Sequence, residues 1–288
     1  MRAFLRVVAV AIAALIACAA TVPPAQADTG RPTWTAGDFW VYGFNGTFYA
    51  GSLFTLAGPG SYRFDVLGVD SIVVGNVSYS AYAVQVAMNV PGTTVFNGGE
   101  YWYRTSDLAL VKTLVNVTAD VFLLGRVTII TTIDYDPPVT VQWPLTASAS
   151  WSSSSNSTVI NQVLNGGSFV TRPRIDAQST VLAGTTVRVP AGSFDVTPLR
   201  TQTNGYVVAY WSPTAGNQAK QQTFAPNNQE TSSSELRAWK YQGTGFLGLP
   251  LVAWLLIVLV AILVIVGLLW RRRQKKGVFT APPPGLPP

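Results

Sequence analysis

Short alternating and β-branched runs, broken at close intervals by turn residues, dominate residues 28–247. "YAVQV" at 82–86 places Tyr, Val and Val on one face and Ala and Gln on the other, and "RVTIITTIDY" at 126–135 is mostly β-branched. "TNGY" at 203–206 sets Asn-Gly between two strand-like runs, which is a strong hairpin signal. "DLALVKTLVN" at 107–116 is ambiguous between helix and strand. The pattern predicts a mainly β fold built from antiparallel sheets.

One stretch of this β-rich region occurs twice. Residues 35–47 read "TAGDFWVYGFNGT" and residues 146–158 read "TASASWSSSSNST". Thr, Ala, Trp, Asn and Thr match at a fixed offset of 111 residues. The matched tryptophans, Trp40 and Trp151, are the expected core anchors of their strands. The Ser run at 152–155 is interpreted as a flexible or glycosylated loop.

A second match follows in the same order. "EYWYRTSDLALVK" at 100–112 resembles "AYWSPTAGNQAK" at 209–220, at an offset of 109 that falls to 108. Two matches in one order predict two similar tandem β units, residues 28–143 and 144–241. Chance is the competing explanation, because Thr, Ala and Ser are common in this chain. The pattern leaves open whether the two units share one sheet or form separate domains.

The N-terminus has the features of a secretory signal peptide, residues 1–27. Two arginines precede an apolar run that is too short to span a membrane, and "AQAD" supplies a small-x-small cleavage site after Ala27. "LIAC" also fits a bacterial lipobox, in which Cys18 becomes the lipidated N-terminus. Cleavage after Ala27 and lipidation of Cys18 both stay open.

The C-terminus predicts a membrane anchor. Residues 251–270 are 20 uncharged residues. As a helix rising about 1.5 Å per residue they would span about 30 Å, the thickness of the hydrocarbon core. The basic run "RRRQKK" that follows favours the cytoplasmic side. We therefore expect a stalk at 242–249, a transmembrane helix at 250–270, and a basic, Pro-rich cytoplasmic tail at 271–288. The PxxP spacing of the tail is typical of a docking ligand and also of a disordered end.

The basic character of the chain comes from these two ends. The chain carries 19 Lys and Arg against 13 Asp and Glu, a formal net charge of +6. Two basic residues lie in the signal peptide and five follow the predicted span, so residues 28–247 hold 12 basic and 13 acidic residues, a net charge of −1. We expect no nucleic-acid partner, because no basic stripe remains. This region also lacks cysteine, so its own core must hold it together without disulfides.

Three motifs resemble those of uncharacterised prokaryotic envelope domains. "WTAGDFWVY" is similar to their G-D-x-W-x-Y opening, "VPAGSFDV" at 189–196 to their V-P-A-G-x-F-D strand, and "YWSPTAGNQAK", which contains Trp211, to their Tyr-Trp strand before a terminal Lys. Such domains distantly resemble the LolA/LppX-like lipoprotein carriers, which implies a curved antiparallel sheet around an apolar cavity. The second unit departs from the opening motif, because Ser148 and Ala149 replace Gly-Asp. We expect architectural roles for Gly192, in a turn or bulge, and for Phe194, packed inward.

Candidate catalytic and metal-binding residues are few. The chain has no histidine, which removes the commonest general base and the usual transition-metal ligand. Asp134 and Asp136 would point to the same side of a strand and Glu100 is a further carboxylate, so a two-carboxylate glycosidase is one hypothesis. "DYDPP" is also typical of a strand that ends in a turn, and it lacks the other ligands of a calcium loop. We assign no catalytic, cofactor-binding or metal-binding residue.

Tryptophans and glycosylation sequons are the remaining candidate features. The tryptophans of the ectodomain can form a sugar-binding row, line an apolar cavity or build an ordinary β core; they are Trp34, Trp40, Trp102, Trp143, Trp151, Trp211 and Trp239. The four sequons lie in the part expected to be outside, at Asn45, Asn76, Asn116 and Asn156.

Together these patterns favour a single-pass type I surface protein of the cell membrane, with its ectodomain outside and its C-terminus in the cytoplasm. The leading functional hypothesis is a non-catalytic envelope interaction or structural role, with an envelope protein or glycan as partner. The alternative is an ectodomain that binds lipid or another apolar ligand, and a glycan-active enzyme is less favoured. The patterns indicate no cofactor and no particular oligomeric state.

Overall fold

The computed structural model of the protein describes residues 29–50, 54–90, 95–121 and 125–242. Over these ranges the chain forms antiparallel β-strands and no helix, so the predicted mainly β fold is confirmed. Within the same ranges, no helix is long and apolar enough to cross a membrane. The predicted signal peptide with Cys18, the stalk beyond Gln242, the transmembrane helix and the tail lie outside the described residues.

The described strands divide between the two predicted units, here called the first half (residues 29–143) and the second half (residues 144–241). Strands of the first half are β1 (Phe39–Ala50), β2 (Phe54–Ala57), β3 (Gly60–Val74), β4 (Val77–Asn89), β5 (Val95–Arg104), β6 (Leu110–Val121) and β7 (Gly125–Asp136). Strands of the second half are β8 (Ser150–Val163), β9 (Ser168–Thr171), β10 (Arg174–Val181), β11 (Thr185–Val189), β12 (Gly192–Thr203), β13 (Gly205–Ser212), β14 (Asn217–Phe224) and β15 (Glu230–Lys240). The ambiguous stretch at 107–116 is thus a turn followed by the start of β6.

The Ser run at 152–155 lies inside β8, so its interpretation as a flexible or glycosylated loop is wrong. Its backbone pairs residue by residue with β10. Its side chains alternate, with Ser152 and Ser154 exposed and Ser155 buried. Serine is small enough to occupy either face, and ladder hydrogen bonds to a distant strand replace the local turn bonds that serine otherwise favours. Pairing with β10, which the run's composition does not reveal, decides its structure.

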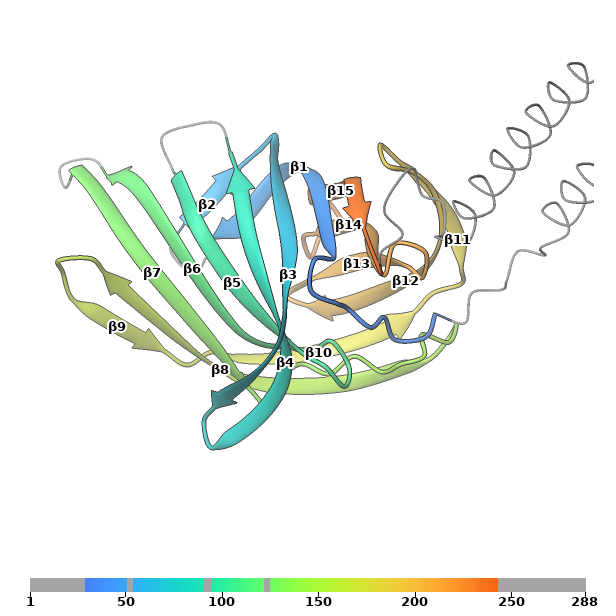
Figure 1. The fold of residues 1–288 in the computed structure, drawn as a ribbon, viewed down its shortest axis with the longest axis horizontal. Helices are drawn as coiled ribbons and strands as arrows, with labels where there is room; N and C mark the ends of the chain where they lie inside the picture. Colours follow the sequence, from blue (N-terminus) through green and yellow to red (C-terminus); the bar gives the residue numbers. More distant parts are fainter. Residues whose placement is uncertain (1–28, 51–53, 91–94, 122–124, 243–288) are drawn as a thin grey trace, which may run out of the picture. The chain divides into compact units, whose positions relative to one another are not determined.

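Twelve of the fifteen strands close into a ring (Figure 1). The order is β1-β3-β4-β5-β6-β7-β8-β10-β12-β13-β14-β15, and the ring closes where β15 pairs with β1. The other three are side strands: β2 pairs with β1, β9 with β8 and β11 with β12. The two halves therefore share one sheet, joined along β7–β8 and β15–β1. Described residues up to Tyr241 belong to one compact unit.

Both halves use the same strand order. The first half runs β1-β3-β4-β5-β6-β7, and the second runs β8-β10-β12-β13-β14-β15. In each half the side strand that follows the first strand folds back onto it, as β2 onto β1 and β9 onto β8. Side strand β11 is the one described strand without a counterpart. This correspondence is what an internal duplication would produce.

A chain of aromatic rings fills the interior of the first half. Tyr42 and Tyr62 stack with ring centroids 4.9 Å apart. The contacts continue through Phe64, Tyr101, Tyr103 and Trp34 to Trp40, at centroid distances of 5.2–6.4 Å. Trp40 is fully buried, with 0% of its surface exposed. Burial of each of the buried rings, Trp34, Trp40, Tyr42 and Tyr62, stabilises the fold by about 2–3 kcal/mol, so this chain is a main source of stability.

Candidate functional site

The repeated opening stretch folds into the same turn in both halves. Residues 35–38 and 146–149 each close with a hydrogen bond from the fourth amide to the first carbonyl, 3.0 Å long in both. The third residue has a positive φ in both turns, +90° at Gly37 and +70° at Ser148, as a type II turn requires. Ser148 therefore keeps the turn although it departs from the motif. Each turn exchanges two backbone hydrogen bonds with a buried valine of the neighbouring ring strand, Val66 in β3 or Val181 in β10.

Each turn leads into a strand that carries a buried tryptophan. Trp40 in β1 donates its indole hydrogen to the carbonyl of Ala215, 2.7 Å away. Trp151 in β8 is 8% exposed and donates to the carbonyl of Thr140, 3.0 Å away. Buried indoles of this kind fix the entry of a strand, because the apolar ring packs while its N–H finds a definite acceptor.

The second repeated stretch forms corresponding hairpins, β5–β6 and β13–β14. Each ladder has a register shift beside its tryptophan, Trp102 or Trp211. Each hairpin also carries a lysine that faces a carboxylate directly across the next ladder. The two pairs are Lys112–Asp134, with N–O 3.3 Å, and Lys220–Glu235, with N–O 2.9 Å. The halves thus repeat a bulge and an ion pair as well as a strand order.

The V-P-A-G-x-F-D stretch forms the β11–β12 hairpin. Val189 pairs with Gly192, which leaves Pro190 and Ala191 as a two-residue loop. Gly192 has a φ of +133°, a conformation that favours glycine. Phe194 is buried, and its ring meets that of Trp239 edge-on with centroids 6.1 Å apart. Gly192 thus shapes this hairpin and Phe194 packs it against β15.

The first strands of the two halves, β1 and β8, differ on the face that carries Trp40 or Trp151. In β1 the next alternate positions hold Tyr42 and Phe44, both buried. In β8 the matching positions, at the same offset of 111 residues, hold Ser153 and Ser155. Ser155 is 1% exposed, and its hydroxyl has no hydrogen-bond partner in the described part of the chain. Aromatic packing is therefore concentrated in the first half and small hydroxyl side chains in the second.

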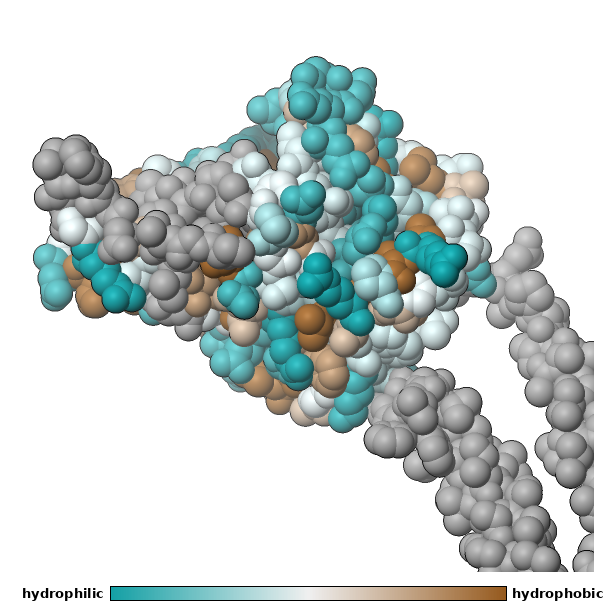
Figure 2. Space-filling model, turned by 90° about the horizontal axis from the view of Figure 1, so that it is seen from above, coloured by the Kyte–Doolittle hydropathy of each residue, from teal (hydrophilic) through white to brown (hydrophobic). Residues whose placement is uncertain are grey.

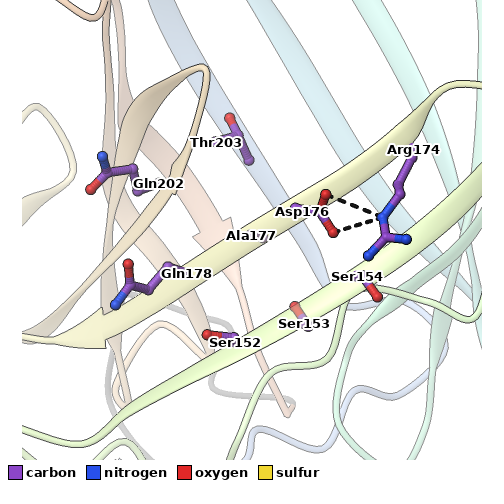
Figure 3. A pocket seen from close by; sticks show the side chains of 9 residues that line it. All are labelled: Ser152, Ser153, Ser154, Arg174, Asp176, Ala177, Gln178, Gln202 and Thr203. Atoms are coloured by element: carbon purple, nitrogen blue, oxygen red, sulfur yellow. Dashed lines mark hydrogen bonds and ion pairs between the residues drawn. The ribbon is translucent and has the colours of Figure 1, made fainter.

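A pocket of about 530 Å³ lies over β8, β10 and the end of β12 in the second half (Figure 3). Its lining is formed by hydroxyl, carboxamide and charged groups with a single alanine: Ser152, Ser153, Ser154, Arg174, Asp176, Ala177, Gln178, Gln202 and Thr203. No aromatic or aliphatic side chain larger than alanine contributes to it.

The pocket side chains are aligned by the strand register. Gln202 of β12 pairs with Gln178 of β10, and Gln178 pairs with Ser152 of β8. Asp176 pairs with Ser154 two residues further along. Directly opposed residues project from the same face of a sheet, and these five side chains are exposed. Neighbouring strands thus present amide and hydroxyl groups about 4.8 Å apart.

The charges of the pocket neutralise each other. Arg174 donates through Nε to Asp176 at 2.9 Å, and both side chains are about two-thirds exposed, at 66% and 67%. Asp176 is the one carboxylate among the residues that line the pocket. Retaining and inverting glycosidases both require two facing carboxyl groups. This arrangement suits recognition of a neutral polar ligand better than acid–base chemistry.

The carboxylates proposed from the sequence lie elsewhere. Asp134 is ion-paired with Lys112, Asp136 is exposed at the end of β7, and Glu100 is half-buried in β5. None of them lines the pocket. Among the described residues, no group of three or more Cys, Asp or Glu side chains is placed to hold a metal ion.

Tyrosines from β3, β5 and β7 lie along and beside the middle of the aromatic chain. Burial raises the pKa of Tyr62 and Tyr135 to about 12. Burial and, to a lesser degree, neighbouring phenols raise the pKa of Tyr101 and Tyr103 still further. These hydroxyls therefore stay protonated at neutral pH. Tyr101, Tyr103 and Tyr135 nevertheless keep part of their surface exposed.

The sequons and the surface add little to this picture. Asn45 in β1, Asn76 in the β3–β4 turn and Asn156 in β8 are exposed, whereas Asn116 in β6 is half-buried. Figure 2 shows hydrophobic side chains scattered among hydrophilic ones on the visible face, in small patches. Larger exposed apolar side chains occur on the β3–β4 and β8–β9 hairpins: Leu67, Val69, Val73, Val77, Ile160, Leu164, Phe169 and Val170.

Sequence reasoning missed the pocket. The composition of its β8 residues predicts a loop, and no motif marks its β10 residues. The usable signal was the alternation in "RIDAQSTV" at 174–181, where Arg174, Asp176 and Gln178 are exposed while Ala177 and Ser179 are buried. That period of two indicates a strand with one polar face, but not which strands lie beside it.

Comparisons with known proteins add two distant likenesses. No family model matches the chain, and no curated protein matches it. A candidate lipoprotein from Parabacteroides distasonis ATCC 8503 is similar over 74% of this chain and 99% of its own, with 14% identity and a TM-score of 0.37. A candidate exported protein with a YmcC-like fold from Bacteroides fragilis NCTC 9343 is similar over 73% of this chain and 99% of its own, with 12% identity and a TM-score of 0.41.

Proposed function

We propose that the protein is a non-catalytic envelope module whose pocket on β8, β10 and β12 binds a hydroxyl-rich, uncharged ligand such as an envelope glycan. The observation that carries this proposal is the aligned row of Gln202, Gln178 and Ser152 on three neighbouring strands. A carboxamide offers both donors and an acceptor, and a serine hydroxyl offers both as well. Such a row matches the mixed donors and acceptors of vicinal sugar hydroxyls.

Electrostatics support a neutral ligand. The only opposite charges in the pocket lining, Arg174 and Asp176, are already paired with each other. The lining therefore carries no net charge to attract an anionic or cationic ligand, and a neutral ligand leaves the pair intact. The absence of histidine from the chain and the single carboxylate of the pocket favour binding over catalysis.

Glycan binding is tested with the detergent-solubilised full chain on a glycan array and by co-sedimentation with purified peptidoglycan. Replacing Gln178 and Gln202 together by Ala removes several hydrogen bonds of about 1 kcal/mol each, so affinity should fall at least about tenfold. Gln229, exposed in the β14–β15 turn, provides the matched control, and Gln229→Ala should bind like the parent. Absence of binding to every glycan tested would contradict the proposal.

Binding of an apolar ligand is the second candidate. It is favoured by Tyr101 and Tyr103 of the aromatic chain, which are partly exposed although neighbouring rings contact them. A ligand there would pack on ring faces and accept hydrogen bonds from phenols. Native mass spectrometry of the full chain with a dialkylglycerol tests this candidate. A bound lipid lost in Tyr101→Ala but kept in Gln178→Ala would place the ligand at the aromatic chain rather than at the pocket.

The proposed setting is a single-pass type I membrane protein built from two similar β units. The charge-free stretch at 251–270 and the basic run after it support the span and its orientation. The shared strand order, turns and ion pairs of the two halves support the duplication. Protease accessibility of the ectodomain on intact cells, with protection of residues 271–288, tests the topology.

A further inference from the structure

With the boundary between the halves placed between Val141 and Gln142, so that Trp143 counts with the second half, two of the indole hydrogen bonds that cross it run in opposite directions. The indole of Trp34, just before the opening turn of the first half, donates to the carbonyl of Gly216 at 2.8 Å. The indole of Trp143, just before the opening turn of the second half, donates to the carbonyl of Asp107 at 2.8 Å. Both acceptors lie in the turn that follows a Tyr-Trp pair, β13–β14 in one case and β5–β6 in the other. Each half therefore supplies the indole that caps a hairpin of its partner half.

The strand pairings that join the halves are reciprocal in the same way: the last strand of each half pairs with the first strand of the other. The last strand of the first half, β7, pairs with the first strand of the second half, β8, over eight residue pairs from Ile129–Val163 to Asp136–Asn156. The last strand of the second half, β15, pairs with the first strand of the first half, β1, over eight residue pairs from Phe39–Lys240 to Gly46–Ser232. Each half taken alone would expose two long unpaired edges, β1 and β7 or β8 and β15.

We propose that each half is the specific partner of the other, so that the two halves recognise each other without a covalent link. The partner that the edges β1 and β7 fit is the β8–β15 half of the same chain. The register and the number of edges fix this pairing without the connection between β7 and β8. The two tryptophan caps add to it: Trp34 precedes β1, and Trp143 lies in that connection, on the side that leads into β8. The inference is independent of the glycan pocket, which lies wholly within the second half.

The connection between the halves offers a place to cut the chain. It runs from residue 137 to residue 149, and Gln142 is exposed within it. A protease site inserted between Val141 and Gln142 leaves Trp143 on the second fragment and leaves Asp107, its acceptor, on the first. The full chain is purified in detergent and cleaved, and the two fragments are then followed by size-exclusion chromatography and native mass spectrometry.

The fragments should stay together as a one-to-one complex with an unchanged β circular-dichroism spectrum. When cleaved protein and an isotopically labelled batch are mixed, unfolded in urea and refolded together, about half of the refolded complexes should contain one labelled and one unlabelled fragment. Separation of the fragments under native conditions, or refolding that yields no mixed complexes and only aggregate, would overturn the inference.

A matched pair of variants tests the tryptophan caps. Trp34→Phe combined with Trp143→Phe keeps a ring at each site and removes the two N–H donors, so the cleaved fragments should dissociate about tenfold faster. Trp102→Phe is the control, because the buried indole N–H of Trp102 has no hydrogen-bond partner among the described atoms. Equal dissociation rates in the double variant and the control would show that the caps play no part in recognition.

Discussion

The indole nitrogen of Trp34 lies 2.8 Å from the carbonyl oxygen of Gly216, 182 residues later in the chain. Gly216 itself has a φ of +63° in the turn between β13 and β14. The N-terminal segment, which belongs to no ring strand, thus determines how a hairpin of the second half ends. A contact over so long a sequence separation forms only when the ring closes, so it reports on the complete fold.

Trp34→Phe should therefore destabilise the whole unit. The substitution leaves the Gly216 carbonyl buried without its donor, which costs about 1–3 kcal/mol. Urea unfolding followed by tryptophan fluorescence and circular dichroism measures the change. Trp102→Phe loses an N–H that donates to no described atom, so it should change stability clearly less than Trp34→Phe. Similar losses in both would show that ring size rather than the hydrogen bond matters.

Ser148→Gly should stabilise the protein. Ser148 has a φ of +70°, and an L side chain in the left-handed region costs about 1–2 kcal/mol relative to glycine, partly offset by the greater freedom of glycine in the unfolded chain. We expect a net gain of about 0.5–1 kcal/mol in the free energy of unfolding. The converse change at the matching turn, Gly37→Ser, should destabilise by a similar or larger amount because its φ is +90°. Effects of the same sign at both turns would contradict the correspondence between them.

Gly192→Ala should destabilise the β11–β12 hairpin. Gly192 has a φ of +133°, and a Cβ there would meet Phe194 at an ordinary 3.9 Å, so backbone strain and not crowding is the reason. A loss of about 1–2 kcal/mol in urea unfolding is expected. Gly184→Ala is the control, because its Cβ would also find ordinary contact, 3.6 Å from the Val196 carbonyl, without a positive φ. A loss at Gly184 equal to that at Gly192 would argue against the strain explanation.

Stability should fall steeply above about pH 10. Burial raises the pKa of Tyr62 and Tyr135 from 10.0 to about 12, so the folded chain holds these protons where the unfolded chain releases them. This contribution is complete below the unfolded pKa of about 10 and is lost as the pH rises through about 12, at most about 2–3 kcal/mol for each tyrosine. Urea unfolding across this range, with tyrosinate absorbance as a second probe, measures it. Tyr135→Phe should flatten the decline, and an unchanged slope would show that Tyr135 ionises outside this window.

The sequence predicted the local architecture better than the arrangement. The alternation in "YAVQV", the Asn-Gly turn before β13 and the matched Trp40 and Trp151 each depend on neighbouring residues, and each was visible in the pattern. Ring closure was not, because a period of two indicates a strand with two faces but does not identify its neighbours. The pocket was missed for the same reason: Gln178 and Gln202 become neighbours only through the β10–β12 register.

The adjacency of β15 and β1 has a consequence for chain order. Phe39 pairs with Lys240, so the two ends of the described unit leave the sheet side by side. A circular permutant that began at Gln142, crossed a short linker from Gln242 back to Thr29 and finished at Val141 would keep every ring neighbour and both tryptophan caps. Nothing in the sheet itself therefore determines which half is translated first.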